Sequence, residues 1–188
     1  LDYYITSKTI VMGTYDFSIR KFDPGKRAAT RSMGGGVRQY MTDRLYFDLK
    51  AALDYIVSYD KTAYYKPMFS ASLAGELDKR TTATLSFDKQ YYTNSYSQDL
   101  FDYWQISASF AKQLLARLKF LVSGFYGNGK YIAQGIQDNL FGLNASMEYE
   151  LTRRAKARIT YSFSKTDSDQ HSRDYTKNTT YAGLRMEF

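Results

Sequence analysis

The chain has 188 residues, a formal net charge of +7, no cysteine and only two prolines. Its 19 tyrosines and 17% aromatic content accompany a mean hydropathy of −0.50, so its apolar residues are more thinly spread than in a soluble core built on Leu, Ile and Val. The absence of cysteine excludes disulfides and thiolate metal sites, and no apolar run is long enough for a transmembrane helix.

Five turn-like segments recur along the chain at a nearly constant spacing. They begin at positions 5, 41, 77, 114 and 151, which gives steps of 36, 36, 37 and 37 residues. Between them, apolar and polar residues alternate with a period of two, the pattern of strands that bury one face. Each unit is therefore predicted to be a long β-hairpin, with a tight turn at one end and a longer polar loop at the other. The turn segments are Ile5–Lys8, Met41–Arg44, Leu77–Arg80, Leu114–Arg117 and Leu151–Arg154.

The alternation predicts ten full strands in this chain. Leu1 to Ile5 keep the same pattern up to the first turn and are interpreted as the end of an earlier strand. Gly34, Gly35 and Gly36 remove three consecutive side chains, which predicts a bulge, a kink or the close approach of another backbone. The expected strands cover residues 9–22, 32–41, 45–59, 66–77, 81–92, 101–112, 117–131, 139–150, 155–165 and 179–188.

The length of these strands indicates the fold class. They alternate for about ten residues or more, whereas a soluble strand averages about 5–6, and about ten residues cross a bilayer core at a tilt of about 45°. A sheet in hydrocarbon must close on itself, because unpaired edge amides cannot be left there. We therefore expect residues 1–188 to form one domain, an all-β transmembrane antiparallel up-and-down β-barrel of the bacterial outer membrane. The short turns would be periplasmic, and the charged segments 23–31 and 165–177 would be external loops.

The number of strands in the complete barrel has two interpretations. The favoured one is that this chain is the C-terminal part of a barrel of about 16–18 strands, truncated at the N-terminus, because Leu1 begins only a few residues before a turn. The alternative is a complete barrel of about ten strands, with Leu1 to Ile5 completing or abutting the last strand. Both give an even number of strands.

Aromatic residues cluster near the predicted strand ends, where amphipathic rings favour the membrane–water interface. On the loop side they include Tyr91, Tyr103, Trp104 and Tyr126. This pattern favours a membrane barrel over the alternative, a large soluble β-barrel or β-helix.

The C-terminus carries a resemblance to a known signature. In Tyr181-Ala182-Gly183-Leu184-Arg185-Met186-Glu187-Phe188 a terminal Phe is preceded by apolar residues at every second position. This resembles the last strand of bacterial outer-membrane β-barrels, which the barrel assembly machinery recognises. The resemblance implies that Phe188, Met186 and Leu184 form an assembly signal.

A second resemblance concerns the last hairpin. Tyr149 to Arg154, Tyr161 to Ser164 and Arg173 to Asn178 look like the last hairpin of a porin-like barrel family often associated with exopolysaccharide export. It implies a polysaccharide as the transported solute.

If the apolar positions face lipid, the opposite positions line a lumen with charges of both signs. Because both signs occur, no anion or cation selectivity follows, and the charges predict either cross-strand ion pairs that stiffen the wall or a polar path for a hydrophilic solute. Tyr40, Tyr46 and Phe125 also fall on the inner positions, where they could stack on sugars or simply pack. The predicted lumen residues are Asp16, Arg20, Arg38, Asp48, Lys50, Asp54, Glu76, Asp88, Arg117, Lys119, Glu148, Glu150, Lys156, Arg158, Arg185 and Glu187.

Three functions are compatible with this pattern. The first is a porin-like channel for a hydrophilic solute. The second is a non-conducting scaffold or sleeve around a partner such as a secretion component, a lipoprotein or a cytochrome. The third is an outer-membrane enzyme, which would need a catalytic residue such as His171, the only histidine. His171 lies in a polar loop, so catalysis is not expected.

No cofactor or metal site is expected, because no phosphate loop, zinc motif or dinucleotide fingerprint occurs and the spacing of Asp167, Asp169 and Asp174 is not that of an EF-hand. The expected partners are outer-membrane lipid and lipopolysaccharide, the assembly machinery, and a polysaccharide or a protein in the lumen. Nucleic acid is not expected, since the basic residues are dispersed and match no recognition pattern.

Overall fold

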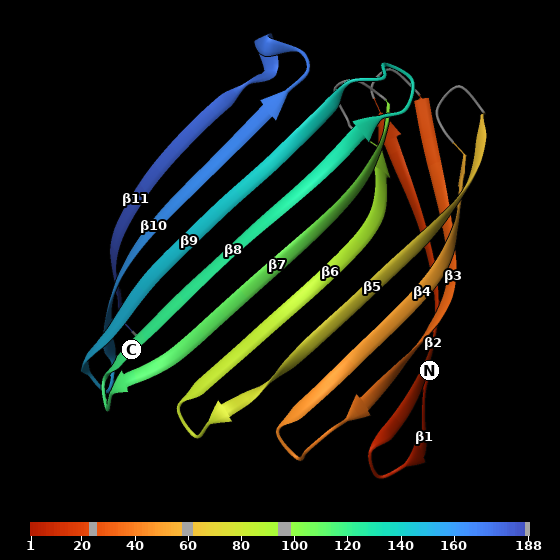
Figure 1. The fold of residues 1–188 in the computed structure, drawn as a ribbon. Helices are drawn as coiled ribbons and strands as arrows, with labels where there is room; N and C mark the ends of the chain where they lie inside the picture. Colours follow the sequence, from red (N-terminus) through yellow and green to blue (C-terminus); the bar gives the residue numbers. More distant parts are fainter. Residues whose placement is uncertain (23–25, 58–61, 94–98, 187–188) are drawn as a thin grey trace.

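The chain folds into one antiparallel sheet of 11 strands, whose order in space follows the sequence from β1 to β11 (Figure 1). The computed structural model describes residues 1–22, 26–57, 62–93 and 99–186. The all-β, up-and-down architecture expected from the sequence is confirmed, with β1 as the additional short strand. The strands are β1 (Asp2–Thr6), β2 (Thr9–Phe22), β3 (Lys26–Tyr40), β4 (Leu45–Val57), β5 (Ala63–Asp78), β6 (Thr81–Thr93), β7 (Leu100–Leu115), β8 (Leu118–Tyr131), β9 (Gln137–Thr152), β10 (Ala155–Ser168) and β11 (Tyr175–Met186), with a short 3₁₀ helix, η1 (His171–Arg173), before β11.

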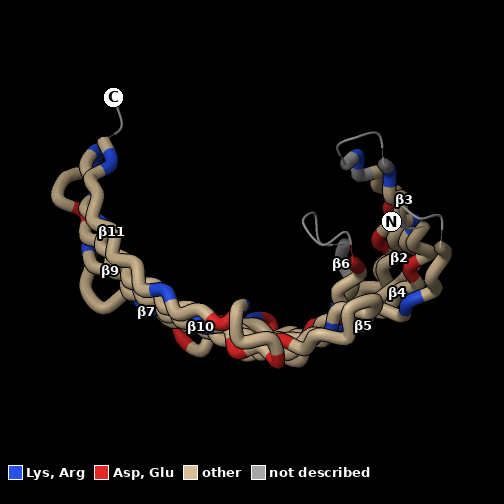
Figure 2. The backbone as a smooth tube through the Cα atoms, turned by 90° about the horizontal axis from the view of Figure 1, so that it is seen from above, with Lys and Arg blue, Asp and Glu red and all other residues tan. Residues whose placement is uncertain are grey.

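Seen from above, the sheet is an open arc with the two chain ends on opposite arms (Figure 2). Among the described residues, β1 and β11 do not pair with each other, so the sheet is a trough rather than a closed cylinder. Closure requires hydrogen-bonding partners for the outer edges of both strands. The loop end of β6 leans into the trough (Figure 2).

The short turns at one end of the sheet share one hydrogen-bonding device. At equivalent positions of the repeat, Thr6, Thr42, Asp78 and Thr152 each accept, through a side-chain oxygen, the N–H of the residue two positions later, at 2.7–3.2 Å. Such side-chain caps stabilise tight turns because they replace a missing backbone partner. The fourth turn has Leu115 at this position, and there Gln113 Nε2 donates instead to the carbonyls of Leu115 and Ala116, both at 3.0 Å.

Several strands are longer than the sequence predicted, and this corrects two of the expected loops. Lys26 to Arg31 belong to β3, while Lys165 to Ser168 and Tyr175 to Lys177 belong to β10 and β11. The pairing of Lys165 with both Phe141 and Thr176 shows that the backbone ladder continues through these charged residues. The charged residues led to a prediction of loops here because charge indicates that a side chain contacts solvent. It does not indicate whether the backbone is hydrogen-bonded to a neighbouring strand. Residues 187 and 188 of the expected last strand lie outside the described part.

The triple glycine of β3 allows close contact with β4. A Cβ on Gly34 would lie 2.5 Å from the carbonyl oxygen of Ala51, and one on Gly36 would lie 2.6 Å from that of Leu49. The register between β3 and β4 continues through this stretch without a shift. Of the three expectations for these glycines, the structure therefore supports the close approach of another backbone.

The convex face of the sheet is apolar and exposed. Leu53, Leu85 and Ile159 are about half exposed, which is the reverse of a soluble sheet and fits a surface turned to lipid. Near the loop end, aromatic rings on this face form contacts from strand to strand, with centroids 4.9–6.3 Å apart. These contacts join Tyr55 to Tyr65, Phe69 to Phe87, Phe87 to Trp104, Trp104 to Tyr126, and Phe141 to Phe163. No described helix is long and apolar enough to span a bilayer.

Candidate functional site: the concave face of the sheet

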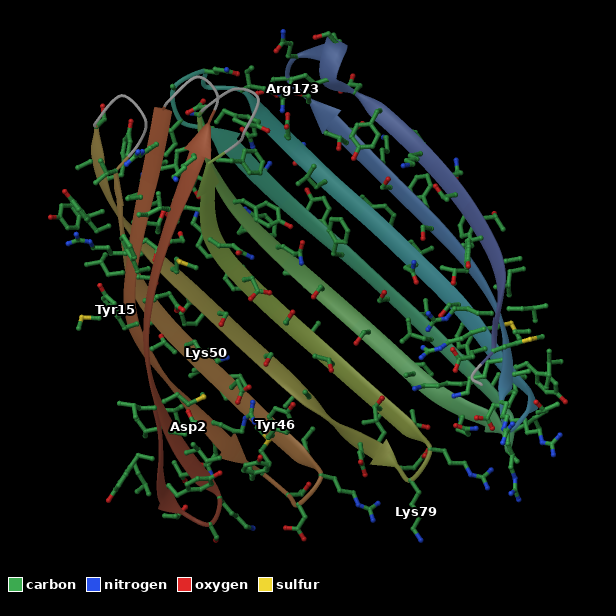
Figure 3. The ribbon with its side chains drawn as sticks, turned by 180° about the vertical axis from the view of Figure 1, so that it is seen from behind. Asp2, Tyr15, Tyr46, Lys50, Lys79 and Arg173 are labelled. Carbon is green, nitrogen blue, oxygen red and sulfur yellow. The ribbon has the colours of Figure 1, made fainter. Side chains whose placement is uncertain are left out.

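The inner positions of the alternation all fall on the concave face. Figure 3 views this face and shows Tyr46 and Lys50 on it, with Lys79 at the short-turn end and Arg173 at the loop end. The strand register explains the grouping, since Asp16 lies opposite Ser32, Ser32 opposite Asp54, and so on across the sheet. The register places these predicted residues on one face: Asp16, Arg38, Asp48, Lys50, Asp54, Glu76, Asp88, Lys119, Glu148, Glu150, Lys156, Arg158 and Arg185.

Three other predicted lumen residues are less well placed. Arg20 pairs with Ala28 at a position on the same face, but its side chain is outside the described part. Arg117 lies in the turn between β7 and β8, and Glu187 is outside the described residues. That the whole set lines a water-filled lumen stays a prediction.

The short-turn end of β3 and β4 holds a compact charged and aromatic cluster. Arg38 donates two hydrogen bonds to Asp48, from Nε at 2.7 Å and from Nη2 at 2.8 Å, and the Asp48 residue is only 8% exposed. The Arg38 guanidinium also lies 4.5 Å from the centroid of the Tyr46 ring, which is 5.6 Å from that of Tyr40. The bidentate geometry and the ring contact make this a rigid part of the wall.

The short-turn end of β8 to β11 carries looser ion pairs. Arg158 lies 3.5 Å from Glu148, and Lys156 lies 3.6 Å from Glu150. Lys119 is opposite Glu148 in the register. These contacts are longer and more exposed than Arg38–Asp48, so each contributes less than about 1 kcal/mol.

Charges of both signs occur along the concave face. Among the predicted residues, β2 to β6 contribute five acids and three bases, and Lys66 of β5, opposite Asp54, is a further base. The strands β8 to β11 contribute four bases and two acids. The first set is Asp16, Asp48, Asp54, Glu76 and Asp88 with Arg20, Arg38 and Lys50, and the second is Lys119, Lys156, Arg158 and Arg185 with Glu148 and Glu150.

A groove without a charged side chain in its lining lies on the concave face, and hydroxyl and amide groups are set in its mostly apolar surface. It has a volume of about 470 Å³ and runs over the concave face from β6 to β10. The ring of Phe125 lies against Gly142 of the next strand, where a Cβ would collide with the ring. One aromatic surface among hydroxyl and amide groups is suited to a hydroxylated ligand. The polar lining is Thr84, Gln105, Ser107, Ser109, Ser123, Asn144, Ser162 and Ser164.

At the loop end, a buried aromatic cluster occupies the concave side. Phe101, Tyr103 and Tyr131 pack together with Ile136 and Leu140 beside them. Tyr103 was expected in the outer aromatic belt, and that expectation is wrong, because the register pairs it with Gly129 on the concave face. The period-two alternation alone could have assigned Tyr103 to the concave face, since Tyr103 falls on the inner positions of β7.

A loop residue that sequence reasoning missed binds this cluster. Arg173 of η1 donates from Nη2 to Asp138 of β9 at 2.7 Å, and its guanidinium lies 4.5 Å from the centroid of the Tyr131 ring. The hydrogen bond with Asp138 raises the pKa of Arg173, so its charge is fixed. Within the described part, Asp138 Oδ1 and Arg173 Nε are buried with no hydrogen-bond partner. An acceptor and a donor thus remain beside an aromatic cluster.

His171 lies in the same loop as Arg173 but takes no part in this cluster. The side chain of His171 is 96% exposed, and its Nδ1 lies 3.2 Å from Asp174 Oδ2. A backbone hydrogen bond from Ser168 and then the contact with His171 lower the pKa of Asp174, so these contacts organise the loop. Among the residues that the structure describes, no group of three or more His, Cys, Asp or Glu could hold a metal ion.

We expect Arg173→Ala to loosen the loop end. Asp138, only 3% exposed, would lose the guanidinium, and truncation of one partner of such a pair costs about 2 kcal/mol or more. Amide hydrogen exchange of residues 132–137 and 169–174 in the folded protein should accelerate by at least tenfold. Lys165→Ala, which breaks the exposed Lys165–Asp167 pair, is the control and should change exchange little. Equal effects of the two variants would contradict the role given to Arg173.

The predicted assembly signal is described in part. Leu184 and Met186 lie in β11 opposite Ala157 and Ala155, on the convex face, and Phe188 lies outside the described residues. Recognition by the assembly machinery stays a prediction.

Comparison with known proteins places the chain in a family. The model of the family described as "Putative beta-barrel porin 2" matches residues 65–188. No curated protein matches the chain. Among solved structures, the chain described as "KdgM porin" matches with a TM-score of 0.38 and 11% identity, covering 97% of this chain and 99% of that one. That likeness is too remote to assign any residue. Because the family match spans more than half of the sequence, this chain belongs to the "Putative beta-barrel porin 2" family and is a porin-like β-barrel protein of the bacterial outer membrane.

Proposed function

We propose that the concave face forms the wall of an outer-membrane channel that passes a hydrophilic solute of the saccharide class, without chemical conversion and without a cofactor. The observation that carries this proposal is the groove at Phe125. Its lining carries no charge, and its hydroxyl and amide groups, some of which bond one another, can exchange hydrogen bonds with a hydroxylated solute, so a chain of sugars could slide rather than bind tightly. The ring of Phe125, which lines the groove, offers a surface for the apolar face of a sugar ring.

Export of a polysaccharide is the specific form of this proposal that the last hairpin suggests. Arg173 supports it, since its side chain is 30% exposed beside Tyr131 and its guanidinium could donate to a sugar hydroxyl at the loop end. The groove and this cluster lie on one face of the sheet, so a long solute could contact both.

The test is single-channel conductance of the full-length protein in a planar bilayer, with and without neutral oligosaccharides. Stable open steps that the sugars block are expected. Phe125→Ala should weaken the block by about threefold to tenfold, if the lost stacking resembles an aromatic pair worth about 0.5–1.5 kcal/mol. Phe120→Ala is the matched control, because Phe120 lies on the same strand but on the convex face, and it should leave the block unchanged.

Two outcomes would contradict the proposal. Silence from a correctly folded protein would favour the alternative of a sleeve filled by a partner protein, which should then co-purify in a fixed ratio. Block that is equally strong in Phe125→Ala and the unchanged protein would remove the groove from the path of the sugar.

A further inference from the structure

An arginine interrupts the aromatic belt on the convex face near the loop end. Across four adjacent strands the register aligns Phe17, Arg31, Tyr55 and Tyr65 in one row. The Arg31 guanidinium lies 5.8 Å from the centroid of the Phe17 ring, and the rings of Tyr55 and Tyr65 are 4.9 Å apart. A charged group in this row lies at the level of the membrane–water interface, where such rings are found.

Two further cations lie nearer to the loop on the same face. Lys21 of β2 is directly opposite Arg27 of β3, and both side chains are exposed, as is that of Arg31. Like charges directly opposite each other destabilise a strand pair. Among the described residues, none of the three cations forms an ion pair.

Two other cations on the convex face near the loop end have an acidic partner in an ion pair. Lys89 pairs with Asp102, and Lys165 pairs with Asp167 at 2.8 Å. Lys21, Arg27 and Arg31 therefore form a patch of three positive charges without a counter-charge from the described chain. On the side away from the loop, the patch is bordered by the apolar side chains of Phe17 and Ile19, which lie on the same face.

We propose that the patch of Lys21, Arg27 and Arg31 binds the phosphate groups of the lipid A headgroup in the outer leaflet. The loop end of an outer-membrane barrel faces that leaflet. Guanidinium groups bind phosphate oxygens through paired hydrogen bonds, and each basic side chain near an anionic surface adds attraction. Phe17 and Ile19 would contact the acyl chains below the phosphates. The inference rests on the membrane location and concerns the face opposite the proposed channel.

The experiment compares the full-length protein with two triple variants. In Lys21→Gln/Arg27→Gln/Arg31→Gln the patch is neutral, whereas Lys79→Gln/Arg153→Gln/Arg154→Gln removes the same charge from exposed residues of the short turns. Each protein is reconstituted in phosphatidylcholine nanodiscs, and binding of diphosphoryl lipid A and of its dephosphorylated form is measured by native mass spectrometry. Fluorescence of Trp104, the only tryptophan, and heat-dependent gel mobility check that each variant is folded.

Neutralising the patch should weaken binding of diphosphoryl lipid A by at least about tenfold, while the turn variant keeps its affinity. The unchanged protein should prefer the diphosphoryl form. Equal losses in the two variants would mean that net charge alone attracts the lipid, and equal binding of the dephosphorylated form would leave only apolar contacts; either result overturns the proposal. So would displacement of the lipid by millimolar inorganic phosphate, which would indicate a free-anion site. Conductance is recorded separately, so failure here leaves the channel proposal standing.

Discussion

Replacing Ala108 with arginine is expected to destabilise the folded protein in a bilayer by about 2–4 kcal/mol, the cost of an arginine near the midplane on the lipid face of a barrel. Ala108 lies in the middle of β7, on the convex face, between Leu85 of β6 and Gly124 of β8. Neither neighbour offers a polar group in its side chain, so the guanidinium would have to reach the interface or carry water into the hydrocarbon.

The adjacent residue provides the control. Ser109 faces the trough, between Thr84 and Ser123, so an arginine there would meet hydroxyl groups and solvent. Urea unfolding of both variants in phospholipid vesicles, followed by the fluorescence of Trp104, should show a large loss for Ala108→Arg and a loss below about 1 kcal/mol for Ser109→Arg. If Ser109→Arg were the more damaging variant, the assignment of the two faces would be reversed.

Arg38→Ala is expected to have the second largest effect, a loss of about 3 kcal/mol. This is the lower end of the range for breaking a buried ion pair, because the side chain of Arg38 is 31% exposed while that of its partner Asp48 is only 11% exposed. The variant leaves a carboxylate with little access to solvent and removes the cation from the face of Tyr46.

A double-mutant cycle separates the pair from its surroundings. Arg38→Ala/Asp48→Ala should recover most of the loss, since removal of both partners leaves no unpaired charge. The same cycle on Lys156 and Glu150, an exposed pair 3.6 Å apart, should give a coupling of less than about 1 kcal/mol. Equal coupling energies in the two cycles would refute the special role of Arg38–Asp48. Thermal and urea unfolding in the same vesicles measure all of these variants.

The period-two alternation and the recurring turns were sufficient to predict the architecture, because both are local properties of the chain. Thr42 and Asp78 occupy the same position in successive repeats, and each caps its turn in the same way. The ends of the strands were less predictable, since backbone pairing at Lys26 or Lys165 depends on the partner strand and not on the polarity of the residue.

The candidate site could be predicted as a set of residues but not as an arrangement. Parity along each strand assigns Glu148 and Arg158 to one face, yet only the register shows that they are neighbours. Phe125 was identified as an inner residue, whereas its position over Gly142 depends on the offset between β8 and β9. Nothing in the sequence indicated the contact between Arg173 and Asp138, because it joins residues 35 positions apart and Arg173 lies in the loop of six residues between β10 and β11.

The equivalence of the turns has an evolutionary consequence. The turns recur every 36 or 37 residues, four of the five carry the same side-chain cap, and each strand is hydrogen-bonded to its neighbours in the sequence. Duplication or deletion of one repeat would add or remove two strands while preserving which residues face lipid, because two strands restore the original direction of the chain. A lineage with this design could therefore change the circumference of its wall in steps of one hairpin, and select its solute by pore width before altering any side chain in the wall.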